Sequence, residues 1–252
     1  MIESAMTTTN RTALIIGATG GLGHAITHAL ADMDYSVALV GRDAAKLEAL
    51  RLELGAAADR AHVLPCDVTD RGLAKEMVAS TLERLGSIDV LICASGLNVR
   101  QRSLRSLDPA DWDRVIQGNL TAAFNVIFHV LPSMRERGRG LIVQISSLAG
   151  LRANTITGSA YSSSKFAQSA LGLCIGREER GRGIRSTVLY CGEVNTPLLD
   201  VRADRPGGIS DDRKQSILQP EDIADAVRFL VNLPPRAHIP ELVIKPSVDD
   251  FS

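Results

Sequence analysis

The chain has 252 residues and a net charge of −1, and 45% of its residues are hydrophobic and 23% charged. This length gives ample room for a buried core in one large α/β domain, and the composition excludes disorder as the main state. No basic excess could hold a nucleic-acid backbone, and the 4% of aromatic residues are few for stacking on bases. No apolar run approaches the roughly 20 residues of a membrane helix. We therefore expect a globular protein that binds neither nucleic acid nor membrane.

Residues 1–10 are polar and rich in threonine, and they predict a flexible N-terminus before a single domain over 11–252. This segment contains no basic residue, so it does not have the pattern of a secretory signal. The four cysteines are far apart and show no metal-ligand spacing, which predicts free thiols in a reducing cytoplasm. His24 and His28 lie one helical turn apart without the glutamate of a metalloprotease motif, so we expect no metal.

Strand-like and helix-like stretches alternate from residue 11 onward. The predicted strands cover residues 12–16, 36–40, 61–65, 88–94, 141–145, 185–190 and 241–245. The predicted helices cover residues 22–33, 44–55, 70–85, 108–137, 161–180 and 220–232. Several of these strands are apolar throughout, which is typical of a parallel sheet covered on both faces. The sequence therefore predicts a single-domain, doubly wound α/β fold with a seven-stranded parallel sheet, and a mobile substrate flap over residues 195–216.

A glycine-rich turn follows the first predicted strand. It reads Gly17-Ala18-Thr19-Gly20-Gly21-Leu22-Gly23 and leads into a helix. Such a turn lets the backbone approach a pyrophosphate, and the helix N-terminus supplies N–H groups and a positive dipole end. A tight turn without a ligand is the alternative interpretation. The position of the turn between a strand and a helix favours a dinucleotide site.

Arg42 and Asp43 follow the second predicted strand, where this fold meets the adenosine ribose. An arginine there can bind a 2′-phosphate in two-pronged contact, whereas an acidic residue accepts the ribose hydroxyls of NAD. We predict that Arg42 binds NADP and that Asp43 caps the next helix, with an NAD-binding Asp43 as the alternative. Asp67 and Val68 follow the third strand and either contact adenine or form a simple turn.

The second half of the chain holds four residues whose order is informative. Asn119 lies in the long helix, Ser147 ends the fifth strand, and Tyr161 and Lys165 share one face of the next helix. The whole pattern resembles the classical short-chain dehydrogenase/reductase family across nearly the entire chain. The matching motifs are Gly17-x-x-x-Gly21-x-Gly23, Asp67-Val68, Asn119-Leu120, Ile145-Ser146-Ser147, Tyr161-x-x-x-Lys165 and Gly192-x-Val194-x-Thr196.

The resemblance implies a Rossmann-type oxidoreductase that moves a hydride between NADP(H) and a carbonyl or alcohol substrate. It implies Tyr161 as general acid/base, Ser147 as the hydroxyl that polarises the carbonyl, Lys165 on the nicotinamide ribose and Asn119 holding a relay water. Gly192, Val194 and Thr196 would line the nicotinamide. We expect an ammonium near Tyr161, together with oxidised nicotinamide, to lower the pKa of its phenol. A catalytically silent NADP-binding sensor or scaffold is the rival interpretation.

The chain departs from the family pattern at four places. Ile16 stands where the family has threonine, Cys93-Ala94-Ser95-Gly96 replaces an Asn-Asn-Ala-Gly segment, and Cys191 replaces proline. The fourth departure is a slightly longer gap between Ser147 and Tyr161. The first three concern backbone support of the cofactor site and leave the acid/base set intact.

Substrate and partners are less strongly indicated. Arginines cluster after the fourth strand and in the flap, and the segment Leu199–Arg202 is similar to one in family branches that oxidise 3-hydroxy acids. We therefore predict a substrate with a negative charge, with Arg202 as anchor and Glu193 receiving an amino or hydroxyl group. The resemblance also implies a homotetramer or homodimer, with helix faces at Phe124, Ile127 and Phe128 and at 166–174 as the candidate interface.

Overall fold

The computed structural model describes residues 11–199 and 210–249. Its seven strands form one parallel sheet with the order β3-β2-β1-β4-β5-β6-β7. The strands are β1 (Thr12–Ile16), β2 (Ser36–Gly41), β3 (Ala61–Pro65), β4 (Val90–Cys93), β5 (Gly140–Ser147), β6 (Ile184–Cys191) and β7 (Glu241–Ile244). The helices are α1 (Gly21–Ala31), α2 (Ala44–Glu53), α3 (Arg71–Leu85), α4 (Pro109–Ile116), α5 (Ala122–Arg137), α6 (Ser159–Glu178), α7 (Asp211–Ser216) and α8 (Pro220–Asn232). The predicted doubly wound sheet is confirmed.

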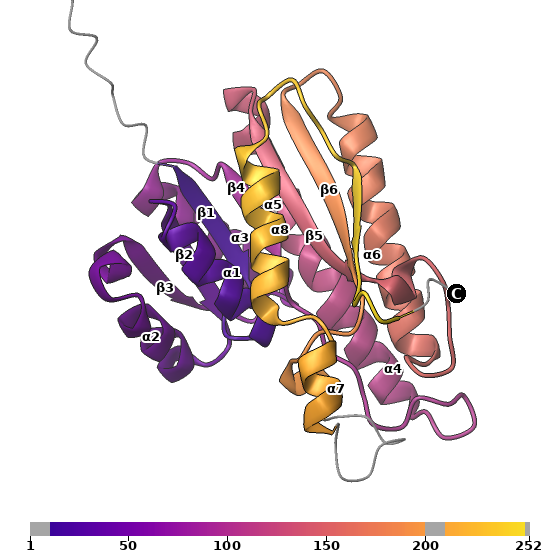
Figure 1. The fold of residues 1–252 in the computed structure, drawn as a ribbon. Coiled ribbons are helices and arrows are strands. Elements are labelled where there is room, and N and C mark those ends of the chain that lie inside the picture. Colours follow the sequence, from indigo (N-terminus) through magenta and orange to yellow (C-terminus); the bar gives the residue numbers. More distant parts are fainter. Residues whose placement is uncertain (1–10, 200–209, 250–252) are drawn as a thin grey trace, which may run out of the picture.

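Helices cover both faces of this sheet (Figure 1). Along β1, Ala13 and Ile15 pack with α1, α2 and α8, whereas Leu14 and Ile16 pack with α3, α5 and the end of α6. Successive side chains of a strand point to opposite faces, so a strand buried on both faces must be apolar throughout. All five residues of β1 are buried, which is the physical basis of its continuous apolar run.

The ends of several elements follow local signals that the sequence contains. Asp43, Asp70 and Asp108 each accept a hydrogen bond from a backbone N–H of the first turn, at the starts of α2, α3 and α4. Gly86 ends α3 in the left-handed conformation. Strand β5 is longer than predicted, because the polar Ser146 and Ser147 continue its pairing with β6.

The predicted single helix over 108–137 is interrupted. Residues Gln117–Thr121 form a π-helical turn between α4 and α5, and Asn119 lies in it. By length and apolar composition alone, the whole stretch Pro109–Arg137 could cross a membrane, contrary to the expectation from the sequence. Val115, Val126 and Val130 in this stretch are fully buried, as expected for a helix that packs on a protein core, whereas Phe124 and Phe128 are exposed.

The predicted flap contains local structure where the chain is described. Pro197–Leu199 form a short 3₁₀ helix and α7 follows at Asp211–Ser216. Ser210 caps α7 by accepting a hydrogen bond from the backbone N–H of Arg213. Residues 1–10, predicted to be flexible, and residues 200–209 of the predicted flap, which include Arg202, lie outside the described residues.

Candidate active site

The glycine-rich turn joins β1 to α1 in a conformation that only glycine allows. Gly17 has φ +80°, and a Cβ there would lie 2.7 Å from the backbone nitrogen of Ser95. A Cβ on Gly23 would overlap the carbonyl oxygen of Gly17. Gly20 precedes α1 and offers no side chain to cap its first N–H groups. These N–H groups therefore suit an anionic ligand at the helix N-terminus.

A cleft of about 380 Å³ opens beside this turn, along the carboxyl ends of the strands. Its lining includes Gly17, Thr19, Gly20, Gly41, Arg42, Asp67, Val68, Thr69, Ala94, Ser95 and Gly96. Ligands of doubly wound sheets bind at such an edge, where the strand order reverses. Six of the residues predicted to contact the cofactor line this cleft, namely Gly17, Thr19, Gly20, Arg42, Asp67 and Val68. The other predicted contacts do not line it: Gly21, Leu22, Gly23, Asn119, Tyr161, Lys165, Val194 and Thr196.

Arg42 and Asp43 differ in what they do in the structure. Arg42 is exposed and lines the cleft. The Asp43 carboxylate accepts a hydrogen bond of 3.1 Å from the backbone N–H of Lys46 at the start of α2. The capping role predicted for Asp43 is confirmed, and the binding of a ribose phosphate by Arg42 stays a prediction.

Asp67 is oriented by its neighbour. Its Oδ1 accepts hydrogen bonds from Thr69 Oγ1 at 2.7 Å and from the Thr69 backbone N–H at 3.1 Å. The bond from the Thr69 hydroxyl is the main cause of a lowered pKa of Asp67, so its carboxyl is ionised at neutral pH. The contact of Asp67 and Val68 with adenine stays a prediction.

A second pocket, of about 520 Å³, lies over the ends of β5 and β6. It is lined by Leu22, Ser147, Tyr161, Gly192, Glu193, Val194 and Thr196, among others. The structure thus brings together the side chains that the sequence assigned to the reacting groups and the nicotinamide. Gly21 belongs to the same region, because a Cβ there would lie 2.8 Å from Thr196 Cγ2.

The phenol of Tyr161 is 9% exposed. Burial raises its pKa to about 12, while a hydrogen bond with Ser147 and the charge of Arg102 act in the opposite direction. In the protein without ligand, burial thus penalises the phenolate more than its neighbours stabilise it. The lowering expected with oxidised nicotinamide bound stays a prediction. Ser147 Oγ also accepts a hydrogen bond of 3.1 Å from the Ala149 backbone N–H, which fixes the hydroxyl.

Lys165 is 3% exposed, and its Nζ lies 5.7 Å from the centre of the Tyr161 ring. The ammonium donates to the carbonyl oxygen of Ile145 at 2.9 Å and to Gln168 Oε1 at 2.8 Å. Burial lowers the pKa of Lys165 to about 8. Its Nζ would lie 3.5 Å from a Cβ on Gly96, which lines the first cleft, whereas Lys165 itself is in the lining of neither pocket.

Asn119 is 1% exposed, and both ends of its amide are bonded. Its Oδ1 accepts from the Leu97 backbone N–H at 2.7 Å, and its Nδ2 donates to Leu97 O at 3.0 Å and to Ser164 Oγ at 2.9 Å. The side chain therefore ties the π-helical turn to the loop after β4 and to α6. A relay water held by Asn119 stays a prediction.

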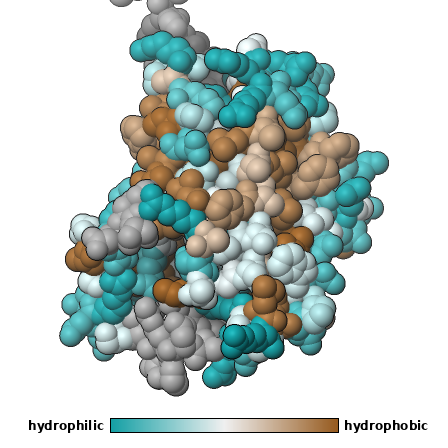
Figure 2. All heavy atoms as spheres, turned by 90° about the vertical axis from the view of Figure 1, so that its right-hand side faces the viewer, coloured by the Kyte–Doolittle hydropathy of each residue, from teal (hydrophilic) through white to brown (hydrophobic). Residues whose placement is uncertain are grey.

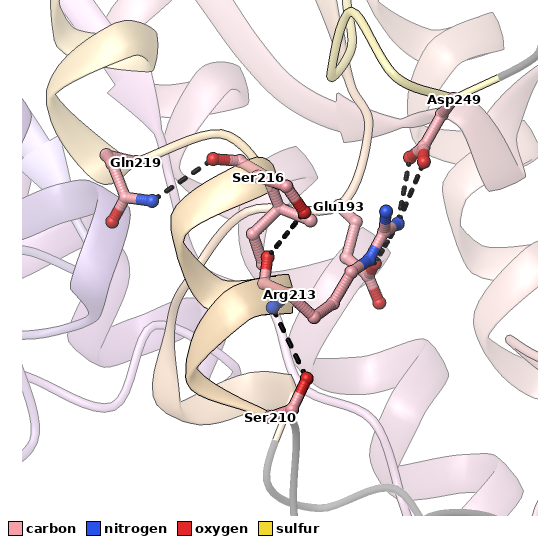
Figure 3. Close-up of polar contacts among 7 residues, drawn as sticks. Glu193, Ser210, Arg213, Ser216, Gln219 and Asp249 are labelled. Carbon is pink, nitrogen blue, oxygen red and sulfur yellow. Dashed lines mark hydrogen bonds and ion pairs between the residues drawn. The ribbon is translucent and has the colours of Figure 1, made fainter.

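The sequence did not reveal a cluster of charges at the far wall of the second pocket. Arg213 of α7 lies between Glu193 and Asp249 (Figure 3), and its Nη2 donates to Glu193 Oε2 at 2.6 Å and to Asp249 Oδ1 at 2.9 Å. All three residues line the pocket. Glu193, predicted to receive a substrate group, is thus bonded to Arg213. No local sequence pattern links residues 193, 213 and 249.

His24, His28 and Glu53 meet on the surface between α1 and α2. Glu53 Oε2 lies 2.7 Å from His24 Nε2 and 3.8 Å from His28 Nε2. A hydrogen bond between His24 and the exposed Glu53 is sufficient to explain why these side chains lie together. Absence of a metal from this protein stays a prediction.

Fold and glycine turn together define a dinucleotide-binding α/β protein, and comparison with known proteins specifies the family. The family model of the short chain dehydrogenases matches residues 11–206. A serine 3-dehydrogenase of Rhizobium radiobacter is 28% identical over 96% of this chain and 96% of its own length. A glycine betaine reductase of Emericella nidulans is 31% identical over 94% of this chain, which spans only 19% of that protein. A solved serine dehydrogenase in a closed form complexed with NADP+ has a TM-score of 0.85 and 28% identity, covering 96% of this chain and 97% of the other.

The protein belongs to the short-chain dehydrogenase/reductase family, an oxidoreductase family that uses a nicotinamide cofactor. The family assignment from the sequence is confirmed.

Proposed function

We propose that this protein is an NADP-dependent oxidoreductase that interconverts a ketone or aldehyde and an alcohol, with Tyr161 as general acid/base. The observation that carries the proposal is that Ser147 and Tyr161 line one pocket with Val194 and Thr196, while the buried Lys165 amine lies beside the Tyr161 ring. Tyr161 as proton donor and Ser147 as hydrogen-bond donor thus share a pocket with the residues that, by the family resemblance, would line the nicotinamide.

A bound nicotinamide supplies or accepts the hydride, and the protein must then manage a proton on the substrate oxygen. With a pKa of about 12, the Tyr161 hydroxyl keeps its proton at neutral pH and can donate it to that oxygen. Ser147 donates a hydrogen bond to the oxygen as negative charge develops there. For alcohol oxidation the roles reverse, and the phenolate form of Tyr161 must be stabilised by nearby positive charge.

Lys165 fits the position of a group that holds the nicotinamide ribose. Its amine lies beside the Tyr161 ring and near Gly96, a residue that lines the first cleft. With a pKa of about 8, most of it is charged at neutral pH. In this proposal the ammonium binds the ribose hydroxyls and its charge favours the phenolate of Tyr161.

NADP rather than NAD is supported by three observations. Arg42 lines the cleft where the ribose phosphate would lie, and the carboxylate of Asp43 is occupied by the start of α2. The similar serine dehydrogenase was solved with NADP+. A guanidinium binds a phosphate through two parallel hydrogen bonds, which a ribose hydroxyl cannot offer.

We also propose that the substrate carries a negative charge. A serine 3-dehydrogenase is among the similar proteins, and serine is a 3-hydroxy acid. Arg102 and Arg213 line the second pocket. However, Arg102 donates hydrogen bonds to the carbonyl oxygens of Val99 and Ile156, and Arg213 binds two carboxylates. Arg202 therefore remains the proposed anchor, by its position in the flap segment.

A substrate screen tests the proposed reaction. Purified protein is incubated with NADPH or NADH and a panel of ketones, aldehydes and 3-oxo acids, and oxidation of the cofactor is followed at 340 nm. Turnover with NADPH that is lost in Tyr161→Phe supports the proposal. Tight NADPH binding without turnover of any substrate would favour the rival function as a silent sensor or scaffold.

A further inference from the structure

Gln168 lies one turn after Lys165 on α6 and is fully buried. Its Oε1 accepts a hydrogen bond of 2.8 Å from Lys165 Nζ, which also donates to the carbonyl oxygen of Ile145 at 2.9 Å. An ammonium has three donors in all. Two acceptors, one on α6 and one on β5, thus engage two of the three donors and hold the amine in place.

The orientation of the Gln168 amide is itself fixed. Its Nε2 donates a hydrogen bond of 3.1 Å to Oε1 of Gln144, which is fully buried on β5. If the Gln168 amide were turned over, its NH₂ group would face the ammonium and two donors would meet. The acceptor on Gln144 therefore keeps the carbonyl oxygen of Gln168 toward Lys165.

The fold makes room for this polar pair between α6 and the sheet. A Cβ on Gly172 would lie 3.0 Å from Gln144 Cγ and 2.8 Å from Val188 Cγ2. Gln144 Nε2 is buried and has no hydrogen-bond partner among the described residues. A buried donor without a partner costs free energy, and two apolar side chains would avoid that cost. Stability alone therefore does not account for the Gln144–Gln168 pair.

The ionisable groups around Lys165 offer its ammonium no negative charge at neutral pH. In the described part of the chain, the ionisable groups whose charges act on the amine are the thiols of Cys93 on β4 and Cys191 on β6. Burial raises the pKa of each thiol to about 12, so both are neutral at pH 7. The Tyr161 phenol, the third ionisable neighbour, is neutral too. The ammonium thus donates its hydrogen bonds to two neutral oxygens, of Ile145 and Gln168, in place of a carboxylate.

We propose that Gln168 is a positioning residue for Lys165, and that the Gln168 oxygen, held in place by Gln144, keeps the amine charged and directed to the edge shared by the cofactor cleft and Tyr161. The inference rests on the proposed role of Lys165. It adds a residue, Gln168, that lies outside the Tyr161-x-x-x-Lys165 motif and supports that role. Gln168 acts through Lys165 and does not itself reach the reacting atoms.

The first test measures the lysine directly and does not depend on a substrate. The chain has five lysines, so the ¹³Cε signal of Lys165 in ¹³C-lysine-labelled protein is assigned by its loss in Lys165→Arg and titrated by NMR. In Gln168→Leu the pKa of Lys165 should fall by about one unit, since one of two acceptors is lost. In Gln168→Glu the pKa should rise. An unchanged pKa in both variants would overturn the proposal.

The second test uses activity and cofactor binding. Gln168→Leu should raise the Kd for NADPH about tenfold and move the alkaline fall of kcat/KM to lower pH, whereas Gln168→Glu should retain binding. Ser169→Ala is the matched control, because Ser169 is buried on the same helix and bonds the carbonyl oxygen of Lys165 rather than its amine. If Gln168→Leu lowers only the melting temperature and leaves the Kd and the pH profile as in Ser169→Ala, the role is structural and the proposal is wrong.

The two tests separate this inference from the proposed function. A protein without turnover, or with full activity in Tyr161→Phe, contradicts the proposed function, yet the NMR titration still reports whether Gln168 supports the amine. Gln168→Met provides a second variant if Gln168→Leu does not fold, because Met fits irregular core space.

Discussion

Asn119 Nδ2 donates a hydrogen bond of 2.9 Å to Ser164 Oγ and so connects the π-helical turn to α6. Ser164 Oγ donates in turn to the carbonyl oxygen of Tyr161 at 2.7 Å. The buried side chain of Asn119 therefore supports, through Ser164, the helix turn that carries Tyr161. These bonds hold the backbone of the helix turn from which the phenol projects, and such preorganisation would serve the acid/base role proposed for Tyr161.

Replacement of Tyr161 by Phe should abolish turnover and leave NADPH binding nearly unchanged. The substitution removes the proton donor but keeps the volume of the buried ring. Steady-state kinetics and a fluorescence titration with NADPH measure the two effects separately. Residual activity within about tenfold of the wild type would exclude Tyr161 as the general acid, since general acid–base catalysis contributes about 10²–10⁴-fold.

Cofactor preference should depend on Arg42. We expect wild-type protein to prefer NADPH over NADH, and Arg42→Ala to reduce that preference about ten- to a hundredfold, which corresponds to about 1.5–3 kcal/mol for one charge-assisted contact. The ratio of kcat/KM for the two cofactors is the measurement. Asp43→Asn is the matched control, because it removes the charge that an NAD site would use. A wild-type preference for NADH would show that the NADP assignment is wrong.

Activity should fall at alkaline pH as Lys165 loses its proton. The pKa of this amine is lowered to about 8 by burial, so it is charged below that pH and neutral above it. We expect kcat/KM for NADPH to be constant from about pH 6 to 7.5 and to decline above about pH 8, because kcat/KM reports the free enzyme. In Lys165→Arg the guanidinium stays charged throughout, so any remaining activity should lack this decline. A flat wild-type profile to pH 9.5 would contradict the assignment.

The glycine turn should not accept side chains at its closest approach. Gly23→Ala would place a Cβ on the Gly17 carbonyl, so backbone must shift. We expect a loss of about 1–3 kcal/mol in the free energy of unfolding, together with weaker NADPH binding. Gly55→Ala serves as the control, because Gly55 has φ +55° but nothing lies within 4 Å of its Cβ position. The control should lose about 1 kcal/mol at most and bind NADPH normally. Equal binding by both variants would contradict the assigned role of the turn.

Local signals made much of this fold predictable. Continuous apolar strands, three aspartate caps and Gly86 define where elements begin and end, and the motif at Tyr161 and Lys165 places the candidate site. The π-helical turn at Gln117–Thr121 was not predictable, because its side-chain contacts are with Leu97 and Ser164, which lie elsewhere in the chain.

Contacts between distant side chains were also missed. Arg213 and Asp249 are separated by 36 residues, and Gln144 and Gln168 by 24, so no periodicity links either pair. The raised pKa of Tyr161 was missed for a related reason, since burial follows from the complete packing of the pocket.

An apolar surface on one side of the molecule is relevant to the predicted oligomer. Figure 2 shows apolar side chains gathered on the face where α6 lies. Phe124 and Phe128 of α5 and Phe166 of α6 are 37%, 57% and 42% exposed, whereas Ile127 is buried in the core. The stripe that was predicted as an interface thus divides between surface and core. Assembly as a homodimer or homotetramer remains a prediction.

The substrate anchor can be tested by comparing an acid with its neutral ester. If Arg202 binds a carboxylate, wild-type protein should oxidise a 3-hydroxy acid with a higher kcat/KM than its methyl ester, and Arg202→Ala should lower kcat/KM for the acid alone by about ten- to a hundredfold. Arg213→Ala is the informative comparison, because Arg213 binds Glu193 and Asp249 and lines the same pocket. Loss of Arg213 releases two carboxylates into the pocket and should impair acid and ester together, with the larger effect on the acid through repulsion. Equal loss for acid and ester in Arg202→Ala, or faster turnover of the ester by wild-type protein, would exclude Arg202 as the anchor.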